Sequence, residues 1–302
     1  MNSWGTPLLI ANPVAGRGGA AKLLPLARAR FDGIGIKDVV ITRAAGDEEP
    51  IVSHAIARGV RSFVILGGDG TCGRVANAIL KSGVDCLLAV VPSGTGNDFA
   101  KTLGVIGSAP AQIADLLMRP NATRIDVGLA DGHYFLNSCG FGFDASVLEA
   151  TSRVHWLKGN AVYIYSALAQ LFTYRGIDVT PSGAPGVERG KMLMVTVSNG
   201  RFLGGAFKIA PQASVLDGRL DACFFSDSDL VERVKLFAGA LRGTHIGMPQ
   251  VSSASVQELL LTFANNPQME IDGELRTARS KSVELRCIPR ALSVVAAPDA
   301  LL

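Results

Sequence analysis

The stretch from residue 62 to 83, SFVILGGDGTCGRVANAILKSG, constrains the fold of this chain most strongly. Its apolar run 63–66 is typical of a strand buried on both faces of a parallel sheet. The segment Gly67-Gly68-Asp69-Gly70-Thr71 follows directly, and apolar residues at helical spacing come next. The stretch therefore predicts a strand, a glycine loop and a helix whose first turn lies near Thr71 and Cys72.

This succession of elements is a phosphate-binding geometry. Glycines let backbone N–H groups approach an anion closely, and the helix N-terminus adds unsatisfied donors and the positive end of its dipole. Asp69 would repel a bare phosphate unless a divalent cation lies between them or the carboxylate orients a nucleophile. The acid therefore favours a Mg²⁺-nucleotide, with an ordinary Gly-Asp-Gly turn as the alternative.

The first third of the chain alternates strand and helix. Short apolar runs predict strands at 8–11, 39–42, 63–66 and 86–91. Each is followed by a polar or glycine-rich loop and a helix, which predicts a doubly wound α/β sheet. Because ligands bind beyond the carboxyl ends of such strands, we expect four loops to share one edge: 12–19, 42–47, 67–71 and 93–98. The GxxxxGK[ST] fingerprint is absent, and no GxGxxG follows the first strand, so the nucleotide is held in another way.

The second half has a different pattern, which predicts an antiparallel β domain, a sandwich. Strands are expected at 123–128, 133–139, 192–199, 206–210, 219–225, 256–264, 268–272, 282–288 and 292–296. A long apolar helix is expected over 156–174 and a second helix over 230–241. The long helix either packs as core against the sheet or walls a lipid-acyl pocket.

Composition sets the broad class of the protein. A chain of 302 residues is long enough for two domains with cores, and 48% hydrophobic with 18% charged residues is an ordinary soluble composition. The net charge of +3 is too small to indicate a nucleic acid partner. The five cysteines have no CxxC spacing, which favours buried thiols in a reducing compartment. Without a signal-peptide pattern or a long apolar run, we expect a cytoplasmic protein.

Three loop motifs together resemble a known family. NPVAGRGG at 12–19, GGDGT at 67–71 and PSGTGNDFAKTLG at 92–104 are similar to the diacylglycerol kinase catalytic-domain family, which includes sphingosine and ceramide kinases and related bacterial enzymes. GGDGT alone also suits NAD kinases, whereas GTGNDFA separates the two families. The resemblance continues through segments 137–147, 197–221 and 270–276.

The resemblance implies a two-lobed enzyme. An N-terminal doubly wound α/β nucleotide-binding domain would span 1–121 and be joined by 290–302. A C-terminal antiparallel β-sandwich domain for the lipid would span 122–289, with the active site in the cleft between them. It also implies ATP contacts from Asn12, Gly16, Thr42, Arg43, Gly67, Gly68, Asp69, Gly70, Thr71, Gly94, Thr95 and Asn97. Ala15 stands where many relatives have Ser, which removes one side-chain donor.

The resemblance further assigns roles to acidic residues. Asp69, Asp98 and Asp126 would act together on the catalytic Mg²⁺, although Asp98 also suits a helix N-cap and Asp126 a strand-end turn. Asp272-Gly273-Glu274 would supply the general base, from either of its two acids, or else form a type I′ hairpin turn.

A second, structural Mg²⁺ site is implied at residues 214–219. It would use the Asp217 carboxylate with the carbonyls of Ser214 and Arg219, and an ordinary β-turn at Asp217-Gly218 is the alternative. This chain has a single Asp where many relatives carry Asp-Asp, which puts the strength of the site in question.

We therefore expect an ATP-dependent lipid kinase that acts at the membrane surface on a lipid hydroxyl such as that of diacylglycerol. The cofactors would be ATP and Mg²⁺, and the protein would be cytoplasmic and peripherally associated with the membrane. A homodimer is left open, and no nucleic acid partner is expected. The alternatives are a kinase of another amphiphilic alcohol (a sphingoid base, phosphatidylglycerol or a secondary metabolite), an NAD kinase, or a catalytically idle regulator that binds nucleotide and lipid.

Overall fold

The computed structural model describes residues 4–118, 122–151, 161–298 and 300–301. The chain forms two compact units. The first comprises Met1–Asp126 and Arg290–Leu302, and the second comprises Val127–Pro289. The second unit is therefore inserted into the chain of the first. Within the described ranges, no helix is both long and apolar enough to cross a bilayer.

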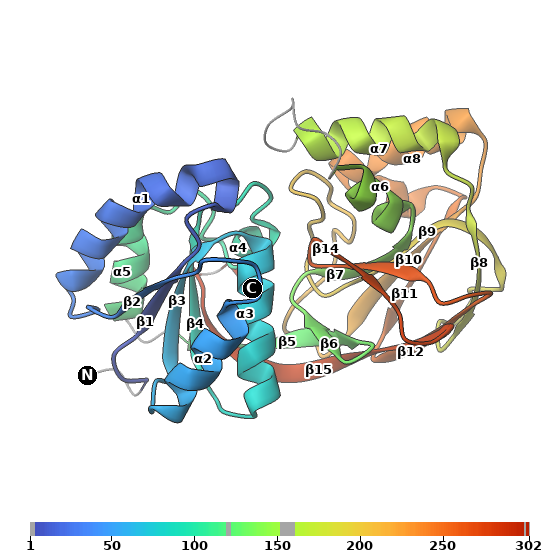
Figure 1. The fold of residues 1–302 in the computed structure, drawn as a ribbon. Coiled ribbons are helices and arrows are strands. Elements are labelled where there is room, and N and C mark those ends of the chain that lie inside the picture. Colours follow the sequence, from blue (N-terminus) through green and yellow to red (C-terminus); the bar gives the residue numbers. More distant parts are fainter. Residues whose placement is uncertain (1–3, 119–121, 152–160, 299, 302) are drawn as a thin grey trace. The chain divides into compact units, whose positions relative to one another are not determined.

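The first unit is built on a parallel sheet with the strand order β15-β4-β3-β1-β2 (Figure 1). Its strands are β1 (Leu8–Ala11), β2 (Val39–Ile41), β3 (Ser62–Gly67), β4 (Leu87–Pro92) and the end of β15 (Ser282–Val295). Every residue of β1 and β3 is buried, as expected for strands covered on both faces. In the register, Val64 of β3 lies opposite Leu9 of β1 and Ala89 of β4.

Helices cover both faces of this sheet. They are α1 (Ala15–Asp32), α2 (Glu48–Ala57), α3 (Asp69–Ser82), α4 (Asp98–Thr102) and α5 (Pro110–Met118). Helix α1 contacts α5, and α2 contacts α3 on the other side of the strands (Figure 1). The predicted doubly wound α/β architecture is therefore confirmed, and α3 begins directly after the glycine loop.

The second unit is an antiparallel β structure, as predicted. Its strands are β6 (His133–Phe135), β7 (Ser138–Gly142), β8 (Ile177–Ser182), β9 (Gly190–Ser198), β10 (Leu220–Ser226), β11 (Val251–Val256), β12 (Glu258–Phe263), β13 (Gln268–Ile271) and β14 (Glu274–Thr277). Two further strands, β5 (Ala122–Ala130) and β15, contribute residues to both units. One core fills the sandwich and includes Phe135, Phe141 and Phe224.

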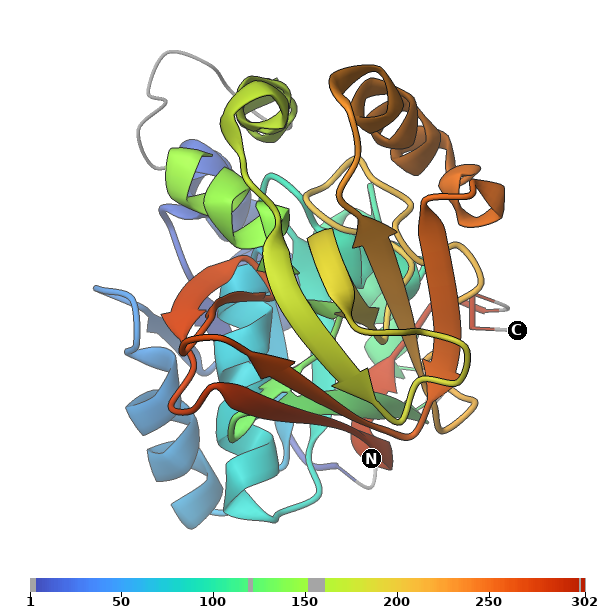
Figure 2. The same cartoon turned by 90° about the vertical axis from the view of Figure 1, so that its right-hand side faces the viewer.

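A second core in this unit lies under the helices. These are α6 (Phe143–Thr151), α7 (Ala161–Thr173), α8 (Leu230–Arg242) and the short 3₁₀ helix His245–Gly247. Strand β10 shows the division between the cores: Ala222 and Phe224 belong to the sandwich core, while Cys223 and Phe225 belong to the core under the helices. Figure 2 shows α7 and α8 at the same end of the unit.

The structure corrects several predicted boundaries. Residues 206–210 form no strand, because Phe207 makes only an isolated bridge with Leu203 in a loop whose apolar side chains enter the helix-side core. The two strands expected at 282–288 and 292–296 are one strand, β15. Of the long helix expected over 156–174, residues 156–160 lie outside the described residues, and α7 begins at 161. Helix α6 was not expected.

Candidate functional site

The loops after β1, β3 and β4 meet at close range. A Cβ atom added to Gly16 would lie 2.1 Å from the carbonyl oxygen of Ser93, and one added to Gly68 would lie 2.9 Å from Cα of Gly94. Gly16 also has φ +59, which favours glycine. The backbones can approach this closely only because these positions have no side chains. The predicted gathering of loops at one edge is confirmed for these three.

The start of α3 supplies N–H groups at this edge. Gly70 and Thr71 lie in the first turn of the helix, where N–H groups have no intrahelical carbonyl to bond. By contrast, the N–H of Gly94 is already occupied, because it donates to Oδ1 of Asn97 at 2.8 Å, and Asn97 Nδ2 donates back to the Gly94 carbonyl at 3.0 Å. Asn97 therefore shapes the loop, and the exposed Thr95 stands at its tip.

Asp69 links two of the loops. Its Oδ1 accepts a hydrogen bond from the N–H of Phe99 at 3.0 Å, so it caps α4 from a different loop. Burial, and then the nearby charge of Asp98, raise the pKa of Asp69 to about 6. Asp98 is not the N-cap of α4, which is Asn97; its Oδ1 instead accepts from Lys101 Nζ at 2.7 Å. The N-cap alternative for Asp98 is therefore wrong.

The first two loops contribute polar side chains. Asn12 Nδ2 donates to Thr71 Oγ1 at 2.9 Å, which ties the first loop to the third. Thr42 is buried at the end of β2, and its N–H donates to the carbonyl of Ala11 at 2.9 Å. Arg43 is exposed, and its N–H donates to Oδ2 of Asp47 at 2.7 Å. The Arg43 side chain therefore projects from a loop that Asp47 holds in shape.

Asp126 is fully buried at the point where the chain leaves the first unit. Its Oδ1 accepts from the N–H of Arg290 at 2.8 Å, where the chain returns. Among the described residues, no three Asp, Glu, His or Cys side chains converge on a position for a metal ion. Asp69 and Asp98 nevertheless fit a Mg²⁺ ion. A divalent cation would reduce the repulsion between the two neighbouring carboxylates, and Mg²⁺ needs few protein ligands because it keeps several of its own waters.

In the second unit, Asp272 and Gly273 form the hairpin turn between β13 and β14, with φ +47 and +87 as in a type I′ turn. Asp272 is nevertheless only 7% exposed. Its carboxylate accepts three backbone N–H bonds, from Leu136 at 2.6 Å, Asn137 at 2.8 Å and Ser138 at 3.1 Å. The turn is thus fixed to the segment between β6 and β7.

Glu274 lies two residues further along. Its Oε2 accepts from Arg276 Nη2 at 2.7 Å, and its side chain is 28% exposed. The two acids of the turn therefore differ: Asp272 is buried and anchored by backbone N–H groups, while Glu274 is partly exposed and pairs with Arg276. The hairpin is confirmed, and the role of each acid stays a prediction.

The proposed structural metal site has a turn geometry. Asp217 Oδ1 accepts from the N–H of Arg219 at 3.0 Å, and Ser214 Oγ accepts from the N–H of Leu216 at 3.3 Å. Asp221 was not singled out in the sequence; burial, and then the charge of Asp217, raise its pKa to about 6. A cation bound here would reduce the repulsion between the carboxylates of Asp217 and Asp221, which Arg219 only partly offsets.

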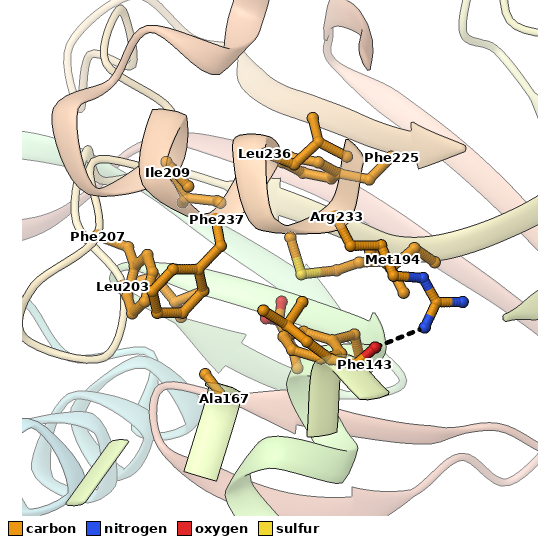
Figure 3. A pocket seen from close by; sticks show the side chains of 14 residues that line it. Phe143, Ala167, Met194, Leu203, Phe207, Ile209, Phe225, Arg233, Leu236 and Phe237 are labelled. Carbon is orange, nitrogen blue, oxygen red and sulfur yellow. Dashed lines mark hydrogen bonds between the residues drawn. The ribbon is translucent and has the colours of Figure 1, made fainter. Parts of the chain in front are cut away.

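The second unit also contains an apolar pocket that is partly open to solvent. Leu203, Phe207 and Phe237 lie together on one side of it, and Phe143 lies on the other side, toward Arg233 (Figure 3). Loop 203–209 and helices α6, α7 and α8 supply most of the lining. No sequence pattern indicated these partners, because they are far apart in the chain.

One buried acid, Asp144, lines this pocket. Its Oδ2 accepts from Thr196 Oγ1 at 2.7 Å, and burial raises the pKa of Asp144 to about 7. A carboxyl group in this state is partly protonated near neutral pH and can donate as well as accept a hydrogen bond. The motif GFGFDASV contains Asp144, but nothing in this motif indicates that its carboxyl group is buried.

The chain thus has an α/β unit with three glycine loops gathered beside the start of α3, followed by a β-sandwich unit that holds an apolar pocket. Comparison with known proteins agrees with this arrangement. Residues 6–130 match the diacylglycerol kinase catalytic domain, and residues 137–296 match the YegS C-terminal NAD kinase beta sandwich-like domain.

Whole-chain relatives have the same two parts. A protein named "Diacylglycerol kinase" from Bacillus subtilis is 28% identical over 88% of this chain and 88% of its own length. A protein from Pseudomonas putida named "Probable lipid kinase YegS-like" is 32% identical over 85% of this chain and 84% of its own. A crystal structure of a diacylglycerol kinase from Bacillus anthracis covers both chains completely, with a TM-score of 0.73 at 22% identity, and so supports the fold. The chain belongs to the diacylglycerol kinase and YegS-like family.

Proposed function

We propose that this protein is a lipid kinase that transfers the γ-phosphoryl group of ATP to a hydroxyl of a lipid such as diacylglycerol. The observation that carries the proposal is the close approach of the Gly16, Gly68 and Gly94 backbones beside the start of α3. A surface of bare backbone at a helix N-terminus suits a chain of phosphates, which needs N–H donors and no side-chain bulk. Family membership supports the same reaction class.

The first unit would bind and orient the nucleotide. Asn12, Thr42 and Arg43 lie on loops beside the glycine edge, and the Thr95 hydroxyl stands at the tip of the fourth loop. Asp69 and Asp98 would hold the magnesium ion. When bound, Mg²⁺ neutralises the phosphate oxygens on which charge develops during transfer. Asp126 would act with Asp69 and Asp98 on this magnesium ion, in addition to accepting the hydrogen bond from the Arg290 N–H.

The second unit would bind the acceptor. The apolar pocket suits the acyl chain of a lipid and has little to offer a dinucleotide, which favours a lipid over NAD as the acceptor. One acid of the turn Asp272-Gly273-Glu274 would take the proton of the attacking hydroxyl, and the other would position it. Three N–H bonds hold the Asp272 carboxylate in one orientation, and the Glu274 carboxylate pairs with Arg276.

The loop around Asp217 would bind a structural Mg²⁺. We propose this because the charges of Asp217 and Asp221 are close enough to raise the pKa of Asp221, while Arg219 only partly offsets them. Asp217 is exposed, so water would complete the coordination of the ion.

The decisive experiment is transfer of labelled γ-phosphate from Mg-ATP to acceptors in mixed micelles: diacylglycerol, sphingosine, phosphatidylglycerol and a total lipid extract, with NAD in solution. A labelled product in the organic phase is expected, and it identifies the acceptor class. Asp69→Asn keeps an oxygen that can accept from the Phe99 N–H but loses the negative charge. We therefore expect the fold to stay intact and turnover to fall by about 10²-fold or more. Labelled NAD alone, or unchanged turnover in the variant, contradicts the proposal.

A further inference from the structure

Helix α7 exposes a line of large apolar side chains. Tyr165, Leu168 and Phe172 are 44%, 40% and 67% exposed. Their spacing of three and four residues places them on one face of the helix. The opposite face is buried, and its residues Ala167 and Leu171 line the apolar pocket. The helix is therefore apolar on both the pocket side and the solvent side.

Helix α8 has the same arrangement. Leu230, Val231 and Val234 are 43%, 63% and 44% exposed, while Leu236 and Ala240 are buried and line the pocket. Single exposed apolar residues are normal in a soluble protein, but two neighbouring helices that both carry a line of them make a patch, and such patches mark interaction sites.

The two helices that carry these lines are neighbours. Helix α7 contacts α8, and Arg233 of α8 donates from Nη1 to the carbonyls of Leu171 and Tyr174, both at 2.9 Å. Figures 1 and 2 both show the helices at the same end of the unit, beyond the strands. We call this surface the α7–α8 face, defined by Tyr165, Leu168, Phe172, Leu230, Val231 and Val234.

Exposed cations accompany these apolar side chains. Arg175 follows α7, and Lys235 and Arg242 lie on α8; all three are exposed. The acids of the same helix are engaged locally: Asp229 Oδ1 accepts from the Glu232 N–H at 3.0 Å, and Glu232 Oε1 accepts from Gln250 at 2.8 Å. Apolar residues beside Lys and Arg are the combination that lies in the headgroup region of an anionic bilayer.

We propose that the α7–α8 face docks on the surface of an anionic phospholipid bilayer. Apolar side chains of both helices enter the boundary between headgroups and acyl chains, and Arg175, Lys235 and Arg242 contact the lipid phosphates. The inner faces of the same helices line the pocket, so docking places the pocket-forming helices against the source of its ligand. The link between docking and the pocket rests on the proposed function. The docking surface itself is inferred from the exposed apolar side chains of α7 and α8 and the exposed cations beside them.

Co-sedimentation of the full chain with vesicles tests the proposal. Vesicles of phosphatidylglycerol and phosphatidylcholine are compared with phosphatidylcholine alone, at low and high salt. We expect binding to the anionic vesicles, weakened by salt, and a loss of about tenfold or more in Leu168→Gln/Phe172→Gln and in Val231→Gln/Val234→Gln. Leu26→Gln, on α1 and 47% exposed, is the matched control and should bind like the wild type.

The proposal is overturned if the wild type binds no anionic vesicles, or if the double variants bind them as tightly as the wild type. Sedimentation velocity tests whether a second copy of the chain, rather than a bilayer, binds to the α7–α8 face. If the double variants dissociate a dimer and keep full vesicle binding, the face is a protein interface and the proposal fails.

Activity on a short-chain diacylglycerol, dissolved as monomers, separates this inference from the proposed function. Docking variants should phosphorylate the monomers at the wild-type rate and lose activity only on vesicles. If the wild type phosphorylates no lipid but its vesicle binding still depends on the α7–α8 face, the kinase proposal fails and the docking surface stands. If the variants lose activity on monomers as well, the face serves the pocket rather than a bilayer, and the docking proposal is overturned.

Discussion

Replacing Asp144 by Asn should make the protein more stable at alkaline pH and leave its stability at acidic pH nearly unchanged. Burial raises the pKa of the Asp144 carboxyl from its ordinary value of 3.8 to about 7. The folded chain therefore favours the protonated form. The stability that this preference contributes is fully present below about pH 4 and is lost as the pH rises to about 7.

The size of the effect follows from the shift in pKa. Each pKa unit corresponds to about 1.4 kcal/mol, so a shift from 3.8 to about 7 makes ionised Asp144 cost the folded state roughly 4 kcal/mol, as an upper value. Asn carries no charge and retains an oxygen that can accept from Thr196 Oγ1. The difference in the free energy of unfolding between Asp144→Asn and the wild type should therefore grow from near zero at pH 4 to a few kcal/mol at pH 8.

Urea unfolding, followed by circular dichroism at several pH values, measures this difference. Asp69 and Asp221 also have raised pKa values, so the wild-type curve alone does not isolate Asp144. Asp178→Asn is the control, because Asp178 is exposed on β8 and its replacement should reproduce the pH dependence of the wild type. If the curves of Asp144→Asn and the wild type stay parallel from pH 4 to 8, the buried ionisation at Asp144 is refuted.

Two further predictions concern the proposed site. Asp272→Asn should lower the free energy of unfolding by about 1–3 kcal/mol, because an amide replaces one of two oxygens that accept three backbone N–H bonds. Glu274→Gln should leave the free energy of unfolding nearly unchanged. In single-turnover kinetics, the variant with the greater loss in the rate of phosphoryl transfer identifies the base, and wild-type rates in both variants would remove the turn from the mechanism. Gly94→Ala would place a Cβ atom 2.4 Å from Gly68 Cα, so calorimetry should show ATP binding that is weaker by about tenfold or more. Gly19→Ala is the control and should bind ATP normally, because its added Cβ would lie 3.8 Å from the nearest atom. Equal ATP affinities of the two variants would argue against a phosphate cradle made of backbone.

The sequence predicted most reliably what depends on neighbouring residues. The run 63–66 is apolar at every position because β3 is covered on both faces, and its glycine loop follows in the same segment. Loops at the carboxyl ends of parallel strands then meet as a matter of topology, so the predicted meeting of the first, third and fourth loops needed no knowledge of contacts.

What the sequence did not predict depends on partners far along the chain. Asp69 caps α4 at Phe99, thirty residues away, and displaces Asp98 from the role that local sequence suggested. Residues 206–210 alternate like a strand, but Phe207 and Ile209 are buried by α8 and the loop around them, without a partner strand. Asp144 is a similar case, because only the folded pocket shows that its carboxyl is buried.

The insertion of one unit into the chain of the other determines the order in which the protein can be completed during synthesis. The sheet of the first unit needs Ser293 and Val294 of β15, which pair with Leu87 and Leu88 of β4, and the buried Asp126 needs the N–H of Arg290. These partners leave the ribosome only after all of residues 127–289. In nascent chains, β4 should therefore stay without its β15 neighbour, and Asp126 without the Arg290 N–H, until the whole β-sandwich has been synthesised.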